Sequence, residues 1–254
     1  MEIDDKKKEE LYRIINESEN IVFFGGAGIS TASGIPDFRG ANGLYNYTPE
    51  EIISHTFFEN HTKEFYEFYF SKMVYRDALP NECHKFLALL EKTKKLSAVI
   101  TQNIDSLHQK AGSSNVVELH GSVYRNYCTK CGCFYSLDSD AFKRINYNGI
   151  PKCEKCGCVI KPDVVLYEEA LKEEDITRAI KYISSCDTLI VAGTSLVVYP
   201  AASFIRFFRG KNLIVINLGK IETYQIASLE IDGKVEDYLN TDNFYKYIGK
   251  SYAR

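Results

Sequence analysis

Two Cys-x-x-Cys pairs constrain the fold of this chain more than any other feature of its sequence. Cys128 and Cys131 form the first pair, and Cys153 and Cys156 form the second. The stretch between the pairs is short enough to fold back, so four thiolates can surround one tetrahedral Zn²⁺ at about 2.3 Å. A closed set of four thiolates leaves no open position for water. We therefore predict one structural zinc ion per chain.

The remaining cysteines fall into two groups, alternative zinc ligands and buried structural residues, and two histidines are also expected to be structural. Cys133 and Cys158 each follow a predicted ligand by two residues and remain alternative ligands, although Cys-x-x-Cys-Gly is the more usual zinc knuckle. Buried thiols behave as small apolar groups, and we expect this of Cys83 and Cys186. The residues expected to be structural are Cys83, Cys186, His84 and His108.

Outside the cysteine segment, short apolar runs alternate with segments of helical periodicity. Apolar runs with little polar alternation are typical of parallel strands that are covered on both faces. Phe86, Leu87 and Leu90 exemplify the helical spacing between them. The alternation predicts an α/β fold with a doubly wound, Rossmann-like parallel sheet. The runs expected to form strands are Ile21–Phe24, Ala98–Ile100, Val116–Val117, Val164–Leu166, Thr188–Val191 and Leu213–Ile216.

Two segments depart from this alternation. Residues 40–79 are rich in Phe and Tyr at helical spacing, and residues 121–161 carry the cysteine pairs. We interpret them as a helical insertion and a zinc-ribbon insertion that together form a smaller lobe over the strand ends. The whole chain, 1–254, would then be one domain whose Rossmann-like lobe comprises 1–39, 80–120 and 162–254.

Composition restricts the class of protein and its partners. With 45% hydrophobic and 26% charged residues, the 254-residue chain has the composition of a globular protein. A net charge of −3 makes nucleic acid an unlikely main partner, and no apolar run has the length of a membrane span. The first residues lack an apolar signal region, so the eight cysteines indicate metal binding in a reducing cytoplasm. The oligomeric state is not predicted.

A glycine-rich loop follows the first expected strand. Gly26 and Gly28 match the start of the dinucleotide fingerprint Gly-x-Gly-x-x-Gly, but Thr31 occupies the third position. Glycines in such a turn let backbone N–H groups approach phosphates. A tight turn that binds nothing would explain the same glycines. The mismatch at Thr31 argues against an ordinary dehydrogenase.

Polar side chains follow the second and third expected strands. Gln102, Asn103 and Asp105 come after the second strand, and His120 comes after the third. Ligands of open α/β sheets bind beyond the carboxyl ends of the strands. His120 suits a general base because the pKa of imidazole lies near neutrality. Asn103 or Asp105 could also cap a helix, which does not exclude ligand binding.

This ordered set of motifs resembles the sirtuin family, in a single-domain form of bacterial type. The resemblance implies NAD-dependent removal of acyl groups from lysines of proteins, with NAD and zinc as cofactors. The acyl oxygen would attack C1′ of the nicotinamide ribose, giving lysine, nicotinamide and O-acyl-ADP-ribose. The matching motifs are Gly26-Ala27-Gly28-Ile29-Ser30, Ser33-Gly34-Ile35-Pro36-Asp37-Phe38-Arg39, Thr101-Gln102-Asn103-Ile104-Asp105, His120-Gly121, the four cysteines, Gly193-Thr194-Ser195 and Asn217-Leu218-Gly219.

The same resemblance implies roles for individual residues. His120 would be the base that activates the ribose hydroxyls, and Asn103 would bind the ribose and a water. Ile104 and Asp105 would hold the nicotinamide carboxamide. The peptide would add as a strand between two segments, which are Val164, Val165, Leu166 and Tyr167 on one side and Leu196 and Val197 on the other. The other NAD contacts would be Ala27, Thr31, Phe38, Arg39, Gln102, Thr194, Ser195, Asn217, Leu218, Lys234 and Val235.

The sequence departs from the sirtuin pattern at the peptide segment and in the small lobe. Glu168 stands where many members have Gly, so substrate preference can differ here. Members that remove acidic acyl groups carry Tyr and Arg three residues apart, whereas Tyr66 is followed by Tyr69. We therefore expect neutral acyl chains. Two other functions stay open: an NAD-using protein ADP-ribosyltransferase, and a nucleic-acid binder that uses the locally basic zinc ribbon.

Overall fold

A six-stranded parallel sheet forms the centre of the protein. In this computed structural model, which describes residues 4–36, 48–145 and 149–252, the strand order is β3-β2-β1-β7-β8-β9. The chain moves outward in one direction from β1 to β3 and in the other from β7 to β9. This is the predicted doubly wound sheet, and the order reverses between β1 and β7. The strands are β1 Ile21–Gly25, β2 Leu96–Thr101, β3 Val116–Glu118, β7 Thr188–Ala192, β8 Asn212–Asn217 and β9 Leu229–Asp232.

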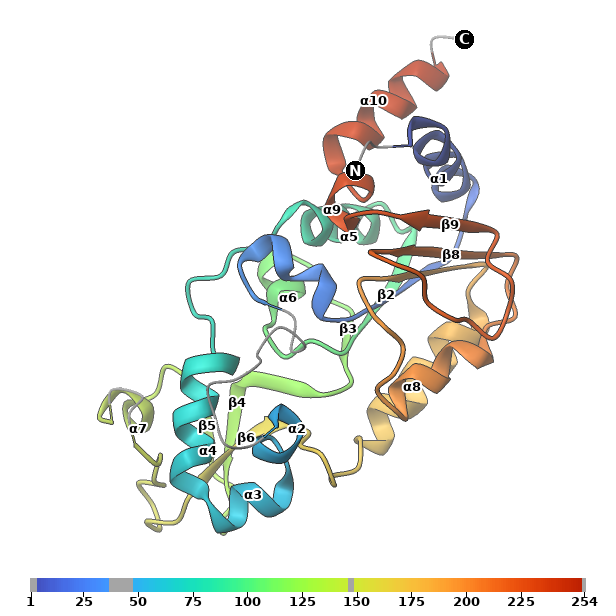
Figure 1. Cartoon of the computed structure of the whole chain (residues 1–254). Coiled ribbons are helices and arrows are strands. Elements are labelled where there is room, and N and C mark those ends of the chain that lie inside the picture. Colours follow the sequence, from blue (N-terminus) through green and yellow to red (C-terminus); the bar gives the residue numbers. More distant parts are fainter. Residues whose placement is uncertain (1–3, 37–47, 146–148, 253–254) are drawn as a thin grey trace.

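Helices cover both faces of this sheet (Figure 1). Leu11, Phe86 and Phe244 pack on one face, and Ile183 and Phe204 pack on the other. Burial on both sides explains why the strands are apolar at successive positions. Throughout the described ranges, no helix combines the length and apolarity that a membrane span requires. The elements are α1 Asp5–Glu17, η1 Ala27–Ile29, η2 Thr31–Ser33, α5 Glu82–Lys92, α6 Leu107–Ala111, α8 Glu173–Ser185, η5 Ala201–Phe207, α9 Val235–Tyr238 and α10 Thr241–Tyr252.

A second sheet, antiparallel and three-stranded, carries the cysteine pairs. Its strand order is β5-β4-β6, and it lies beside α2, α3 and α4 on one side of the larger sheet (Figure 1). Aromatic side chains from these helices, including Phe65, Tyr66 and Tyr69, pack with Val123 and Ile160 of the small sheet into a separate core. The elements are α2 Pro49–Ile52, α3 His55–Asn60, α4 Thr62–Phe68, the π-helical turn η4 Tyr69–Met73, β4 Gly121–Cys128, β5 Phe134–Ser136, α7 Asp140–Lys143 and β6 Ile160–Val164.

The prediction of a parallel strand at Val164–Leu166 is wrong. Val164 ends β6, which runs antiparallel to β4 with Gly121 opposite Val164. Buried and partly exposed residues alternate along β6, as in a strand that has only one covered face. The chain then leaves the small sheet, and Tyr167 forms an isolated bridge with Ser54.

Ion pairs join the two sheets close to His120. Arg125 of β4 contacts the buried carboxylate of Glu118 in β3, and its Nε lies 2.9 Å from Oδ2 of Asp163 in β6. Lys172 Nζ completes the network at 2.7 Å from Oδ1 of Asp163. Because His120 lies between β3 and β4, the network fixes the backbone on both sides of the imidazole.

Candidate active site and metal site

A cavity of about 730 Å³ opens at the carboxyl ends of the parallel strands. It lies where the strand order reverses, the usual place for ligands in such sheets. Leu196 is buried in the core and does not line the cavity, and Phe38 and Arg39 fall outside the described residues. The predicted site residues that line it are Ala27, Thr31, Gln102, Asn103, Ile104, Asp105, His120, Val164, Val165, Leu166, Tyr167, Thr194, Ser195, Val197, Asn217, Leu218, Lys234 and Val235.

Two glycines let the loops after β1 and β7 touch through their backbones. The N–H of Gly28 donates to the carbonyl of Gly193 over 2.8 Å. A Cβ on Gly28 would lie 2.8 Å from Cα of Gly193, and a Cβ on Gly193 would lie 2.6 Å from the nitrogen of Ile29. Neither position has room for a side chain, so the glycine loop is held against the end of β7 at the cavity wall.

A buried group of polar side chains connects the loops after β1 and β2. The hydroxyl of Ser30 donates to Oδ2 of Asp105 over 2.6 Å and accepts from Nδ2 of Asn103 over 3.0 Å. Oδ1 of Asp105 accepts from the N–H of Leu107 over 2.9 Å, at the start of α6. Burial raises the pKa of Asp105, and these two hydrogen bonds oppose the rise. Ser30, which belongs to the matched glycine motif but was assigned no role from the sequence, therefore positions both predicted site residues.

His120 is held in the tautomer that a general base needs. Its Nδ1 lies 2.9 Å from the carbonyl oxygen of Gln102. A carbonyl only accepts, so Nδ1 carries the proton and Nε2 keeps its lone pair. Burial lowers the pKa of His120, although the bond to Gln102 acts in the opposite direction. The ring is therefore neutral near pH 7. Nε2 of Gln102 also donates to Oγ1 of Thr194, joining the ends of β2 and β7.

The four predicted zinc ligands converge on one point. All four sulfur atoms lie within 4.8 Å of one another. The Sγ atoms of Cys128 and Cys156 are 3.4 Å apart, and Cys131 lies 3.6 Å from both Cys153 and Cys156. Tetrahedral zinc with Zn–S bonds of about 2.3 Å requires sulfurs separated by about 3.8 Å. The thiolates therefore fit one structural zinc ion.

The two halves of the zinc site repeat one backbone pattern. Cys128 N–H donates to the carbonyl of Cys133 over 2.9 Å, and Cys153 N–H donates to that of Cys158 over 2.8 Å. Cys133 and Cys158 thus close each turn through their backbones, and neither belongs to the four-sulfur group. The paired cysteines, rather than the two alternatives, are the ligand set that fits zinc.

The groups expected to be structural lie inside the protein. Cys83 and Cys186 are 0% and 3% exposed, and burial raises the pKa of Cys186 to about 12, which keeps the thiol protonated. The His84 and His108 rings are buried with centroids 4.7 Å apart. Burial lowers the pKa of His84 to about 4 and that of His108 well below its usual value. Both rings are therefore neutral near pH 7.

One wall of the cavity comes from the helical segment and was not predicted from the sequence. Lys72, Met73 and Tyr75 line it at the end of η4, and Glu50 and Ile53 line it from α2 and the residue that follows. The π-helical turn breaks the regular spacing of apolar residues, so periodicity could not show which side chains of this segment reach the cavity.

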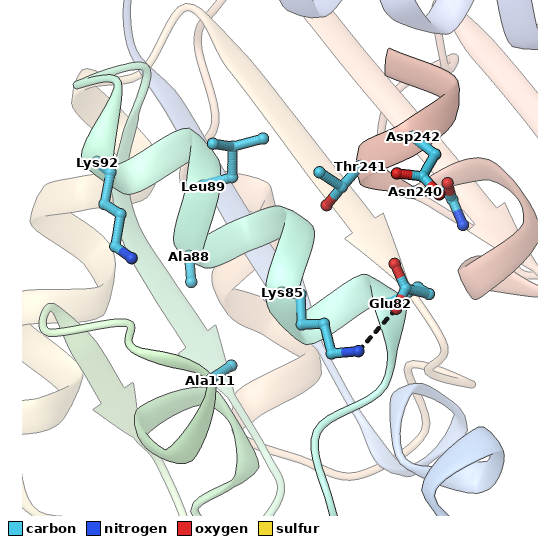
Figure 2. A pocket seen from close by; sticks show the side chains of 9 residues that line it. All are labelled: Glu82, Lys85, Ala88, Leu89, Lys92, Ala111, Asn240, Thr241 and Asp242. Atoms are coloured by element: carbon cyan, nitrogen blue, oxygen red, sulfur yellow. Dashed lines mark hydrogen bonds and ion pairs between the residues drawn. The ribbon is translucent and has the colours of Figure 1, made fainter. Parts of the chain in front are cut away.

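A second hollow lies on the surface between α5, α6 and α10 (Figure 2). Glu82 and Lys85 form an ion pair of 2.8 Å across one end of it. None of its lining residues belongs to the larger cavity. The predicted site residues therefore identify the larger cavity as the candidate active site.

The fold and the site define a Rossmann-like α/β protein with an inserted small sheet whose four cysteines fit zinc. A family model described as the Sir2 family matches residues 26–200. An NAD-dependent protein deacetylase of Clostridium acetobutylicum is 53% identical over 241 residues, which cover 92% of this chain and 97% of that protein. An NAD-dependent protein deacetylase of Clostridium perfringens is 53% identical over 253 residues, which cover 97% of this chain and 98% of that protein. The chain belongs to the Sir2 family.

Solved structures of this family have the same fold. One described as "Sir2-p53 peptide-NAD+" is 37% identical with a TM-score of 0.82, and the match covers 96% of this chain and 98% of that one. A structure of Sir2Tm bound to a propionylated peptide is 35% identical with a TM-score of 0.82, and the match covers 98% of this chain and 100% of that one. The likeness thus extends over both sheets.

Proposed function

We propose that this chain is an NAD-dependent protein-lysine deacetylase. It transfers the acyl group from lysine to ADP-ribose, consumes one water, and releases free lysine, nicotinamide and O-acyl-ADP-ribose. The observation that carries the proposal is that a neutral imidazole, His120, and a fixed amide, Asn103, line one cavity at the reversal of a nucleotide-binding sheet. The family match and the deacetylases similar over nearly the whole chain support it.

NAD would lie across the ends of the parallel strands. Backbone groups of the glycine loop after β1, which is held against Gly193, would contact its pyrophosphate, because Gly26 and Gly28 line the cavity and carry no side chain between the backbone and a ligand. Asn217, the last residue of β8, and Lys234, two residues after β9, would contact the adenosine end. NAD supplies the electrophilic C1′ carbon and a neutral leaving group. Asp105, held by Ser30, would hold the carboxamide of nicotinamide.

His120 would remove a proton from a ribose hydroxyl through Nε2. The bond from Nδ1 to the Gln102 carbonyl fixes the ring and stabilises the positive charge that it gains on protonation. General-base help of this kind accelerates reactions about 10²–10⁴-fold. Asn103 donates to Ser30, which leaves its amide oxygen available to a ribose hydroxyl or a water.

The acyl-lysine peptide would enter between Val164–Tyr167 and Val197, which line the same cavity. Tyr66 and Tyr69 are buried, and their hydroxyls donate to the carbonyls of Ile160 and Val123, so neither can contact an acyl carboxylate. We therefore infer neutral acyl groups. Residues 40–79 and 121–161 would act as one small lobe that zinc stabilises. We place the reaction in the cytoplasm, where thiols remain reduced.

The test is release of nicotinamide that depends on an acetyl-lysine peptide. The purified protein should release it, and His120→Ala should reduce the rate at least about 100-fold without changing zinc content. His61→Ala is the matched control, since His61 stacks on Phe57 in the small lobe and does not line the cavity. ADP-ribosylated protein with the acetyl group still on lysine would support the ADP-ribosyltransferase instead.

A further inference from the structure

Glu168 has a backbone conformation that side chains rarely adopt. Its φ is +75°, in the left-handed region that glycine occupies without strain. It follows the predicted peptide segment directly and lines the cavity. Because a residue with a Cβ is strained in this region, contacts of the glutamate side chain must hold this turn in its conformation.

The carboxylate of Glu168 ties the turn to the start of α3. Its Oε2 accepts from the N–H of Thr56 over 2.9 Å and from Oγ1 of Thr56 over 2.7 Å. These two bonds lower the pKa of Glu168, so the carboxylate is ionised and the bonds are charge-assisted. The side chain thus connects the cavity wall to the small lobe.

Backbone bonds on either side of Glu168 fix the rest of the segment. Tyr167 N–H donates to the carbonyl of Ile53, and His55 N–H donates to the carbonyl of Tyr167, each over 3.0 Å. Leu166 N–H donates to Oε2 of Glu169 over 2.9 Å. Within the described ranges, the N–H and C=O of Glu168 itself have no such partner. These two groups are therefore available to an added strand.

We propose that Glu168 is a positioning residue for the substrate peptide. Its side chain, anchored on Thr56, holds the N–H and C=O of Glu168, which have no backbone partner among the described residues, where a peptide strand can pair with them. Glycine at this position would allow the same backbone conformation but would not anchor it. Main-chain pairing of this kind determines affinity for the peptide and leaves the chemistry at His120 unchanged. The proposal rests on the deacetylase function and adds how this chain orders its peptide site.

The test distinguishes three effects of Glu168: its hydrogen bonds with Thr56, the negative charge of its carboxylate, and the strain of its backbone. Peptide KM, NAD KM and kcat are measured with an acetyl-lysine peptide for the wild type, Glu168→Ala, Glu168→Gly and Glu168→Gln. The Ala and Gly variants lose both bonds, and Gly also relieves the strain. Gln keeps an oxygen that can accept from Thr56 but has no charge. Glu64→Ala, an exposed carboxylate on α4, is the matched control.

We expect peptide KM to rise about five- to tenfold in the Ala and Gly variants, as for loss of hydrogen bonds to a charged group at an exposed site. NAD KM and kcat should stay within about twofold, and Gln should restore most of the peptide KM. An unchanged peptide KM in Glu168→Ala would overturn the proposal. Equal losses in Gln and Ala would instead indicate selection by charge. Absence of turnover by the wild type would refute the deacetylase function itself.

Discussion

The close approach of Gly28 and Gly193 makes a quantitative prediction about the nucleotide site. Gly193→Ala places a Cβ 2.6 Å from the nitrogen of Ile29 and 2.8 Å from the carbonyl carbon of Gly28. These are backbone atoms, so the overlap is relieved only if the loop after β1 moves away from β7. The φ of Gly193 is +56°, which adds strain for any side chain.

Two contributions sum to the expected loss of stability. A left-handed conformation costs a non-glycine residue about 1–2 kcal/mol. Forcing extra atoms into a packed site costs about 1–3 kcal/mol. Gly193→Ala should therefore lower the free energy of unfolding by about 2–5 kcal/mol. Gly112→Ala is the control, since Gly112 has a φ of +106° but nothing lies within 4 Å of its Cβ. It should lose only the strain, about 1–2 kcal/mol.

Urea unfolding with and without NAD measures both effects. Gly193→Ala should also raise the KM for NAD, because the loop that contacts the pyrophosphate is displaced, whereas Gly112→Ala should not. Equal losses of stability in the two variants would show that the overlap is relaxed at no cost. An unchanged KM for NAD in a folded Gly193→Ala variant would refute the assignment of this loop to the pyrophosphate.

Three further predictions concern zinc, acid stability and the pH profile. Cys131→Ser should lose stoichiometric zinc and increase hydrogen exchange in residues 121–161. Cys133→Ser, the control, should keep the metal. Zinc retained in Cys131→Ser would contradict the site. The folded-state pKa values of His84 and His108 both lie below the unfolded value of 6.5, so each residue should lower the free energy of unfolding by up to about 1.4 kcal/mol per pH unit as pH falls below 6.5. His84→Gln should remove the contribution of His84 and so reduce the difference in stability between urea titrations at pH 7 and pH 5. Because the pKa of His120 is lowered, the acid limb of kcat/KM should lie below pH 6.5, and a limb above that pH would exclude a buried neutral base.

Most of the large sheet was predictable because its strands are buried on both faces. Ile21–Phe24 and Leu213–Ile216 are continuous apolar runs, and both form parallel strands. Leu229–Asp232 was not predicted, because this edge strand alternates buried and exposed residues over only four positions. Val164–Leu166 was misassigned because the apolar run straddles the end of β6, and pairing with β4 is a long-range contact.

The candidate site was predictable where its residues follow strands directly. Asn103 and His120 came from that rule and the motif order, and the structure brings them to one cavity. Ser30 and Glu168 could not be assigned in this way. Their contacts, with Asp105 and Thr56, depend on where distant segments meet, which periodicity does not report. Met73 reaches the cavity from a π-helical turn that has no sequence signature of its own.

In the proposed reaction the acyl group of lysine is transferred to ADP-ribose, and NAD is consumed. Purified protein is incubated with an acetyl-lysine peptide and NAD, and the products are quantified by mass spectrometry. We predict free lysine peptide, nicotinamide and O-acetyl-ADP-ribose in equal amounts. Deacetylated peptide with free acetate and no nicotinamide would contradict the account.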